Sequence, residues 1–210
     1  MSDTPPPRIG DPAPDFTAPS SQGDFRFSTR IEGRWAVLLA MPAAFTPVSV
    51  TEILELARLA ESFKAAGAEL VVLTPDTRQA LLAWQRDLKQ RFGVESPAVL
   101  VSDTGLKTAR AWGFIHPGAS ATCPVRASVI VDPKGTVRAL QFHPLANGRS
   151  IAALLTLLEA LQASDEHQCA TPADWSSESG RLLAAPPTRF DEVELDGHGD
   201  KEDFYLRWKS

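Results

Sequence analysis

Residues 35–67 read Trp35-Ala-Val-Leu-Leu-Ala-Met-Pro42-Ala-Ala-Phe-Thr-Pro-Val-Ser49-Val-Thr-Glu-Ile-Leu-Glu-Leu-Ala-Arg-Leu-Ala-Glu-Ser-Phe-Lys-Ala-Ala-Gly67. The run before Pro42 is short and continuously apolar, which favours a buried strand over a helix. Between about residues 49 and 66 apolar residues return at helical spacing, and Gly67 is typical of a residue that ends a helix. This segment therefore predicts a strand, a loop at 42–47 and a helix, in that order.

The alternation of strand and helix continues on both sides of this segment. Short apolar runs bounded by glycine or proline predict strands, and longer runs with apolar residues three or four apart predict helices. The expected elements are a hairpin at 16–34, strands at 70–74 and 99–101, helices at 77–91 and 105–112, a hairpin at 127–140 and a helix at 150–162. Their order predicts an α/β fold, a sandwich with a mixed sheet between layers of helices.

The composition is that of an ordinary globular protein. Of 210 residues, 43% are hydrophobic and 22% charged, enough to bury a core without disulfides. The formal net charge is −5 and no block of basic residues occurs, which argues against nucleic acid as a partner. The two cysteines, Cys123 and Cys169, do not make a disulfide framework. The four histidines lack metal-like spacing, so we expect no metal and no cofactor.

The sequence also predicts the cellular compartment of the protein. The first twelve residues, Met-Ser-Asp-Thr-Pro-Pro-Pro-Arg-Ile-Gly-Asp-Pro, contain no apolar core of a secretory signal. Apolar runs stay below the roughly 18 residues that a membrane-spanning helix needs. We therefore expect a cytoplasmic protein that does not bind membranes.

Residues 163–210 differ in character from the rest of the chain. They are polar and rich in Ser, Pro, Asp and Glu, yet they carry more aromatic residues than a disordered tail would. We expect a domain at 1–162 and a C-terminal arm at 163–210 that packs on the core or on a dimer partner. The aromatic residues are Trp175, Phe190, Phe204, Tyr205 and Trp208.

Several ordered motifs resemble the peroxiredoxins. The segment Pro42-Ala-Ala-Phe-Thr46-Pro-Val-Ser49-Val-Thr-Glu52 is similar to the family signature Pro-x-x-x-Thr-x-x-Cys. The family's opening resembles residues 9–16, and its arginine strand and hairpin resemble residues 125–135. Residues 142–150 and 170–175 look like the one-cysteine subfamily, which has a long C-terminal arm. The resemblance covers about residues 8 to 176, and it is specific because the motifs occur together at the right spacing.

The resemblance implies a thioredoxin-like fold and a reactive group in the first turn of a helix. A helix N-terminus carries partial positive charge, which lowers the pKa of a thiol placed there. Thr46 and Arg126 would hold the peroxide oxygens, and Pro42 would shield the pocket. The family's partners would be a hydroperoxide and a thiol reductant, and its assembly a homodimer.

Position 49 departs from the family because it is Ser rather than Cys. Peroxide reduction needs sulfur to attack an O–O bond and form a sulfenic acid, and a serine hydroxyl has no comparable oxidised state. We therefore expect a peroxidase-inactive chain, from either a natural loss or a deliberate Cys-to-Ser exchange. Met41, Ala44 and Val50 also differ from common family residues, and a single exchange would not produce them.

Other roles for these residues stay open from the sequence. Ser49 can be an ordinary residue of the helix start, and Thr46 can cap the helix. Arg126 can face the pocket or form an ion pair with Glu52. Cys123 precedes Arg126 by three residues and can be a displaced redox cysteine or an inert thiol, and Cys169 lies two residues before the family's resolving position.

Two other functions compete with an inactive peroxidase. The first is a binding or regulatory module that uses the pocket for a small oxygen-rich ligand, or the dimer surface for a protein. The second is a hydrolase built on Ser49, which ranks last because no base is visible near it. The phospholipase-like activity of one-cysteine relatives is not carried over, because Arg34 and Ser28 stand where it would need a serine and a histidine. His116 and His143 are interpreted as packed or surface residues.

Overall fold

The computed structural model describes residues 5–184, 201–203 and 206–209. The chain forms two compact units, Met1–Ile151 and Ala152–Ser210, and each is described by itself. No helix in the described ranges is both long and apolar enough to cross a bilayer.

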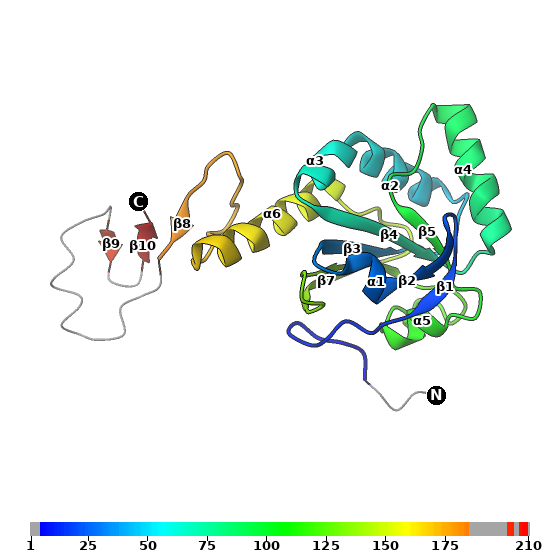
Figure 1. Cartoon of the computed structure of the whole chain (residues 1–210), viewed down its shortest axis with the longest axis horizontal. Helices are drawn as coiled ribbons and strands as arrows, with labels where there is room; N and C mark the ends of the chain where they lie inside the picture. Colours follow the sequence, from blue (N-terminus) through cyan, green and yellow to red (C-terminus); the bar gives the residue numbers. More distant parts are fainter. Residues whose placement is uncertain (1–4, 185–200, 204–205, 210) are drawn as a thin grey trace. The chain divides into compact units, whose positions relative to one another are not determined.

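The first unit alternates strands and helices, as Figure 1 shows in chain order. Its elements are β1 (Thr17–Ser20), β2 (Gly23–Arg26), α1 (Phe27–Ile31), β3 (Trp35–Ala40), α2 (Pro47–Arg58), α3 (Ala60–Ala65), β4 (Ala68–Thr74), α4 (Arg78–Phe92), β5 (Val99–Ser102), α5 (Lys107–Ala111), β6 (Arg126–Val131) and β7 (Val137–His143). The expected strands and the hairpin at 127–140 are confirmed with boundaries that shift by a few residues. The hairpin expected at 16–34 is confined to β1 and β2, and the residues after it form helix α1 instead.

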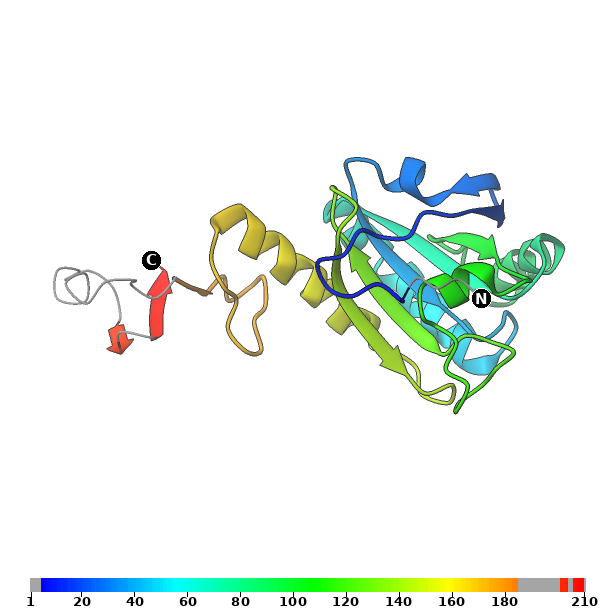
Figure 2. The ribbon, with the colours of Figure 1, turned by 90° about the horizontal axis from the view of Figure 1, so that it is seen from below.

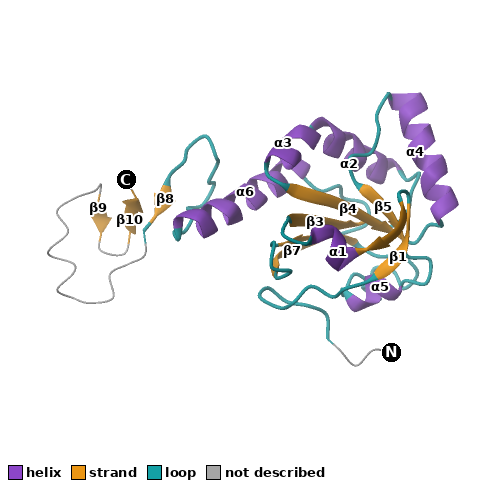
Figure 3. Ribbon diagram, in the orientation of Figure 1, coloured by secondary structure: helices purple, strands orange, loops and turns teal. Residues whose placement is uncertain are grey.

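The strands form one mixed sheet in the order β2-β1-β5-β4-β3-β6-β7 within the described residues. Strands β3, β4 and β5 are parallel, and the remaining pairs are antiparallel. Helices α2, α3 and α4 cover one face and α1 and α5 the other (Figure 3). The expected α/β sandwich with a mixed sheet is confirmed.

The core lies on both faces of the central strands. In β3, alternate residues such as Ala36 and Leu38 pack with Phe27 of α1 and with Trp112, which follows α5. Their neighbours Val37 and Leu39 are fully buried too, because helices cover both faces. This explains why the strand is continuously apolar instead of alternating.

The helix expected at 49–66 is divided in the structure. Helix α2 ends at Arg58, Leu59 adopts φ −100° and ψ 9°, and α3 begins at Ala60. Neither proline nor glycine occurs at this break, so the residue pattern gave no sign of it. Helix α4 follows its sequence signals closely: Thr77 caps it by accepting from Ala80 N, and Gly93 ends it with φ 69°.

An N-terminal segment lies against the outermost strand. Gly10 N donates to Val137 O, Val137 N donates to Asp11 O, and Ala13 N donates to Gly135 O. Figure 2 shows this segment in dark blue, crossing beside the two strands of the β6–β7 hairpin. Further toward the N-terminus, a Cβ added at Gly113 would lie 2.5 Å from the Cβ of Pro6, so the two backbones need glycine to approach this closely.

The described part of the second unit contains helix α6 (Ile151–His167), whose first residue belongs to the first unit, and three short strands. Strands β8 (Leu182–Leu183), β10 (Leu206–Lys209) and β9 (Lys201–Asp203) make an antiparallel sheet in that order. Of the aromatic residues expected to anchor the arm, Trp175 and Trp208 are half-buried, and Phe190, Phe204 and Tyr205 lie outside the described residues. The division at 162, and the surface on which residues 163–210 pack, stay predictions.

Candidate active site

The loop between β3 and α2 presents the first turn of the helix. Asp76, which follows β4, accepts a hydrogen bond from Ala44 N over 2.7 Å. The next residue, Phe45, adopts a left-handed backbone with φ 56°. Thr46 occupies the N-cap position in an extended conformation, and Pro47 is the first helical residue. A carboxylate from a neighbouring strand end therefore holds the loop from which the helix starts.

Ser49 lies in the first turn of α2, where the resemblance places the reactive group. Its side chain has no exposed surface. Thr46 Oγ1 donates to Ser49 Oγ over 2.7 Å and lies 3.0 Å from its other acceptor, the carbonyl oxygen of Ala43. Because a hydroxyl has one proton, Thr46 can donate a hydrogen bond to only one of these two acceptors at a time.

Arg126 reaches Ser49 from the start of strand β6. Its side chain is 2% exposed, and its Nη1 donates to Ser49 Oγ over 3.2 Å. Its Nε donates to Leu145 O over 2.8 Å, which fixes the plane of the guanidinium. Side chains alternate along a strand, so Arg126 lies on the opposite face to Ala127 and Val129, which pack in the core beside α1. That alternation directs Arg126 toward α2.

Glu52 lies one turn further along α2 and binds two arginines. Arg126 Nη1 donates to its Oε2 over 2.9 Å. Arg149 donates to Oε1 from both its backbone N and its Nε, over 3.0 and 2.8 Å, and to Oε2 from Nη2 over 2.8 Å. Arg149 Nη1 donates to Ala127 O. All three charged side chains are buried, so the cluster is a closed ion network beside Ser49.

The network changes the pKa of its members. Burial by itself would raise the pKa of Glu52, but the hydrogen bonds and charge of Arg149, with the charge of Arg126, outweigh it and lower the pKa below its usual value. Burial also lowers the pKa of Arg126; the charge of Glu52 opposes this shift and the charge of Arg149 adds to it. Glu52 is thus an anion dedicated to the arginines, and it is a poor general base.

The structure brings three of the four sequence-predicted site residues together. Thr46, Ser49 and Arg126 are joined by hydrogen bonds. Pro42 begins their loop and is half-buried, and its shielding role stays a prediction. The ion pair of Arg126 with Glu52 is confirmed, and Arg126 also donates to Ser49, while its role toward a peroxide stays a prediction. Thr46 does not cap the helix with its side chain, since its hydroxyl is directed to Ser49 and Ala43 O instead.

Arg149 and Asp76 are the two residues of the site that sequence reasoning missed. Arg149 belongs to the Gly148-Arg149-Ser150 end of a motif that already resembled the family, but no spacing tied it to Glu52, 97 residues earlier. Position in a family motif was therefore the one available signal for Arg149.

Among the described residues, no cysteine or histidine side chain is hydrogen-bonded to the Ser49 cluster, although Cys123 is close enough to Arg126 to raise its pKa by charge. Cys123 and Cys169 are free and half-buried, and both the backbone N and Sγ of Cys123 lie 3.2 Å from Ser120 Oγ. His116 packs on Phe142 with ring centroids 5.0 Å apart, consistent with a packed histidine. The described part of the chain holds no group of three or more side chains that could bind a metal.

Comparison with known proteins matches this geometry to a family. The sequence pattern of the AhpC/TSA family matches residues 9–140, which include β1 to β6 and the site loop. The chain belongs to the peroxiredoxin (AhpC/TSA) family. The peroxiredoxin of Aquifex aeolicus is 37% identical over 196 residues, covering 89% of this chain and 88% of that protein. Peroxiredoxin 2 of Thermoplasma acidophilum is 34% identical over 200 residues, covering 95% and 99%.

Solved peroxiredoxin structures share the whole fold. A cysteine-to-serine mutant of peroxiredoxin 6 from Arenicola marina superposes with a TM-score of 0.83 at 27% identity, covering 96% of each chain. The yeast mitochondrial 1-Cys peroxiredoxin superposes with a TM-score of 0.86 at 26% identity, covering 96% of this chain and 98% of that one. The thioredoxin-like fold expected from the sequence is therefore confirmed.

Proposed function

We propose that this chain is a peroxiredoxin of the one-cysteine type in which Ser49 stands at the position of the peroxide-attacking cysteine. We further propose that the chain as it stands does not reduce peroxides. The observation that carries the proposal is that Thr46 and Arg126 both donate to Ser49 Oγ in the first turn of α2. Donors that converge on one atom at a helix start are suited to a thiolate and to the oxygens of a bound peroxide.

The chemistry explains the expected loss of activity. A thiolate attacks one peroxide oxygen, the O–O bond breaks, and sulfur is oxidised to sulfenic acid while the other oxygen leaves as water or an alcohol after taking a proton. Serine oxygen cannot be oxidised in this way. A serine nucleophile for acyl transfer would need a base, and Glu52 binds two arginines with a lowered pKa and has no hydrogen bond to Ser49. The hydrolase is therefore disfavoured.

The experiment compares three forms of the full chain with a small dithiol as reductant. The unaltered protein and Ser49→Ala should not consume hydrogen peroxide or an alkyl hydroperoxide above the rate of buffer. Ser49→Cys should consume peroxide at a rate at least about a thousandfold higher, equivalent to about 4 kcal/mol of activation free energy. Fast turnover by the unaltered chain, retained when Cys123 and Cys169 are both changed to serine, would overturn the proposal.

A binding or regulatory role is the second candidate, and the ion network favours it. Arg126, Glu52 and Arg149 retain a closed set of contacts although Ser49 cannot perform the redox step. A pocket built around an arginine is suited to a small oxygen-rich ligand. An inactive Ser49→Cys variant that still folds would favour this role, because it would show that the pocket no longer serves peroxide reduction.

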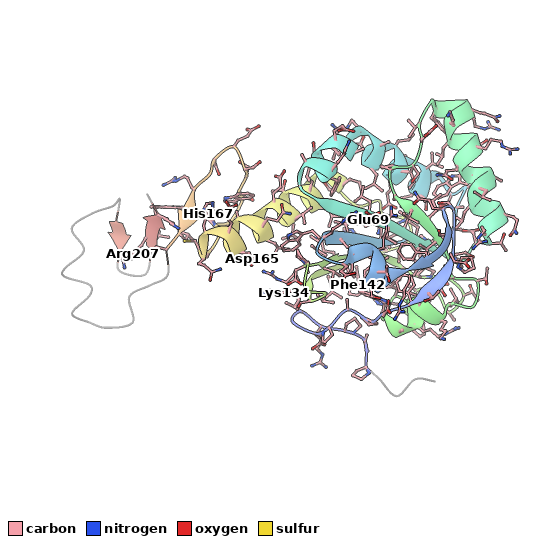
Figure 4. The ribbon with its side chains drawn as sticks, in the orientation of Figure 1. Glu69, Lys134, Phe142, Asp165, His167 and Arg207 are labelled. Carbon is pink, nitrogen blue, oxygen red and sulfur yellow. The ribbon has the colours of Figure 1, made fainter. Side chains whose placement is uncertain are left out.

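We also propose that the chain works as a homodimer through the outer edge of β7. The N-terminal segment bonds to residues 135–137, and no described strand covers residues 139–143. Phe142, labelled in Figure 4, is 45% exposed on this strand. An uncovered edge strand with an exposed aromatic residue is a ready site for pairing with a second sheet.

The oligomeric state tests this proposal. Light scattering after size exclusion should give twice the chain mass for the unaltered protein and the mass of one chain for Phe142→Asp. A monomeric unaltered protein would contradict the proposal.

A further inference from the structure

A cavity lies between the N-terminal segment and the last part of strand β7. Its volume is about 410 Å³, within the range of about 300–1,000 Å³ that is typical of small-molecule sites. Residues 6–9 form one wall, and Trp112, His116, Leu140 and Phe142 contribute to the others. We call this cavity the N-terminal pocket. It shares no residue with the cluster at the first turn of α2.

The walls of the N-terminal pocket are mostly apolar. Leu140 packs against the core cluster that includes Trp112, which places both on the sheet face that α1 and α5 cover. Phe142 lies two residues further along β7 and therefore points to the same face. Ile9 is 69% exposed and Phe142 is 45% exposed, so two large apolar side chains meet water beside one cavity. An apolar occupant would cover both of them.

The pocket also presents hydrogen-bond donors that have no acceptor among the described residues. Trp112 is 1% exposed, and its Nε1 is buried without a partner. The Asp11 carboxylate accepts from the backbone N of Arg8, and no described residue pairs with the Arg8 guanidinium. The ring of His116 packs on Phe142, and no described residue hydrogen-bonds to its nitrogens. Buried donors are normally satisfied, so this pocket is suited to a ligand that brings an acceptor.

The charge of the pocket favours an anionic acceptor. Arg8 carries a permanent positive charge, and no carboxylate occurs among the described residues that line the cavity. The imidazole of His116 has at least one N–H to donate in either protonation state. A carboxylate is therefore complementary to this rim, and an alkyl chain is complementary to the apolar walls.

We propose that the N-terminal pocket binds a medium-chain fatty carboxylate. The carboxylate accepts from Arg8 and His116, and the chain packs on Trp112, Leu140 and Phe142. The inference goes beyond the proposed function, because it uses none of the residues around the first turn of α2. Pairing along the outer edge of β7 would use main-chain groups, which leaves the face of the strand to the ligand.

Titration calorimetry of the full chain tests the class of ligand. Octanoate should bind saturably. Butyrate should bind at least about tenfold more weakly, because it lacks half of the apolar chain. Octanol should bind at least about threefold more weakly, because it lacks the charge. No saturable binding of octanoate, or equal binding of octanoate and either control compound, would overturn the proposal.

Two pairs of variants locate the site. Arg8→Gln should weaken octanoate binding about threefold, as expected for an exposed charge pair. The same exchange at Arg86, exposed on α4 at the other face of the sheet, should leave binding unchanged. Ile9→Glu places a carboxylate at the rim and should weaken binding at least about tenfold, and Ile9→Gln should weaken it less. Octanoate binding that is unaffected by both Arg8→Gln and Ile9→Glu would overturn the proposal.

The indole N–H groups give a second readout. Trp112 and Trp84 both have a buried Nε1 without a partner, but only Trp112 lines the N-terminal pocket. In nitrogen–proton correlation spectra of the full chain, the resonance assigned by Trp112→Phe should shift saturably with octanoate. The resonance assigned by Trp84→Phe should not move. No shift at Trp112, or an equal shift at Trp84, would overturn the proposal.

Discussion

Ser49 and Glu52 lie one turn apart on helix α2, and under the proposed function only Ser49 departs from what the chemistry of the family requires. Ser49 carries a hydroxyl at the position that we propose for the reactive sulfur. At Glu52 a carboxylate still binds Arg126 and Arg149 through a full set of short hydrogen bonds. Under the proposed function, the difference teaches that the ion network of a peroxidase site and its nucleophile are separable. The network of Glu52, Arg126 and Arg149 is part of the buried structure of the unit, so a serine at position 49 does not remove the structural reason to keep it.

The largest stability effect is expected at Glu52. Changing Glu52→Gln removes the one negative charge between two buried arginines, and we expect the free energy of unfolding to fall by about 3–5 kcal/mol. Denaturant unfolding followed by circular dichroism measures this. The matched control is Glu55→Gln on the same helix, whose pair with Arg58 is exposed and should be worth less than about 1 kcal/mol. Equal losses would show that the network is no more important than a surface pair.

The next largest effect is expected on peroxidase activity, from a change at Thr46 beside the first turn of α2. In a Ser49→Cys background, Thr46→Val removes the hydroxyl that donates to position 49 and should lower kcat by about a hundredfold. Peroxide consumption under saturating reductant measures this. Thr51→Val is the control, because Thr51 Oγ1 donates only to Val48 O on the exposed side of the helix. If the two variants lose activity equally, Thr46 has no special role in the site.

A smaller effect is expected at the loop that positions the first turn. Asp76→Ala removes the carboxylate that accepts from Ala44 N and should cost about 1.5 kcal/mol of unfolding free energy. Hydrogen exchange of the Ala44 amide should become faster. Asp76→Asn retains an acceptor oxygen and should keep most of the protection. Unchanged exchange in the alanine variant would mean that the loop is held by other contacts.

The smallest effect is the pH dependence of the Glu52 contribution. Because the pKa of Glu52 is lowered in the folded chain, its stabilisation is fully present above the ordinary glutamate pKa of about 4.3 and is lost as pH falls toward the lower folded pKa. The difference in unfolding free energy between the unaltered chain and Glu52→Gln should therefore shrink on acidification. A difference that is constant with pH would contradict the ion network as the source of stability.

Most of the fold was readable from the sequence because its signals are local. The continuously apolar run of β3 reports a strand that is covered on both faces, and Thr77 and Gly93 mark the ends of α4. The break at Leu59 was not readable, because no residue there has a strong preference against helix. The edge position of β7 was not readable either, since pairing order depends on contacts between distant segments.

Only the site residues that lie in family motifs could be predicted from the sequence. Thr46, Ser49 and Arg126 could be named because they match motif positions, and their hydrogen bonds confirm that they meet. The sequence alone could not show which residues belong to the ion network around Glu52. Arg149 is 97 residues from Glu52, and buried arginines look like surface arginines in a sequence. Asp76 was also missed, because its role depends on two loops lying side by side.

The proline-rich beginning of the chain looks like a dispensable leader, but its three main-chain bonds to residues 135–137 make it part of the sheet's boundary. In a protein trimmed to start at residue 14, the outer edge of strand β7 would be uncovered along its entire length. Uncovered strands recruit other strands without regard to register or partner. Trimming would thus leave the whole outer edge of β7 open to pairing in any register, and we expect the trimmed protein to form fibres or precipitate more readily than the full chain.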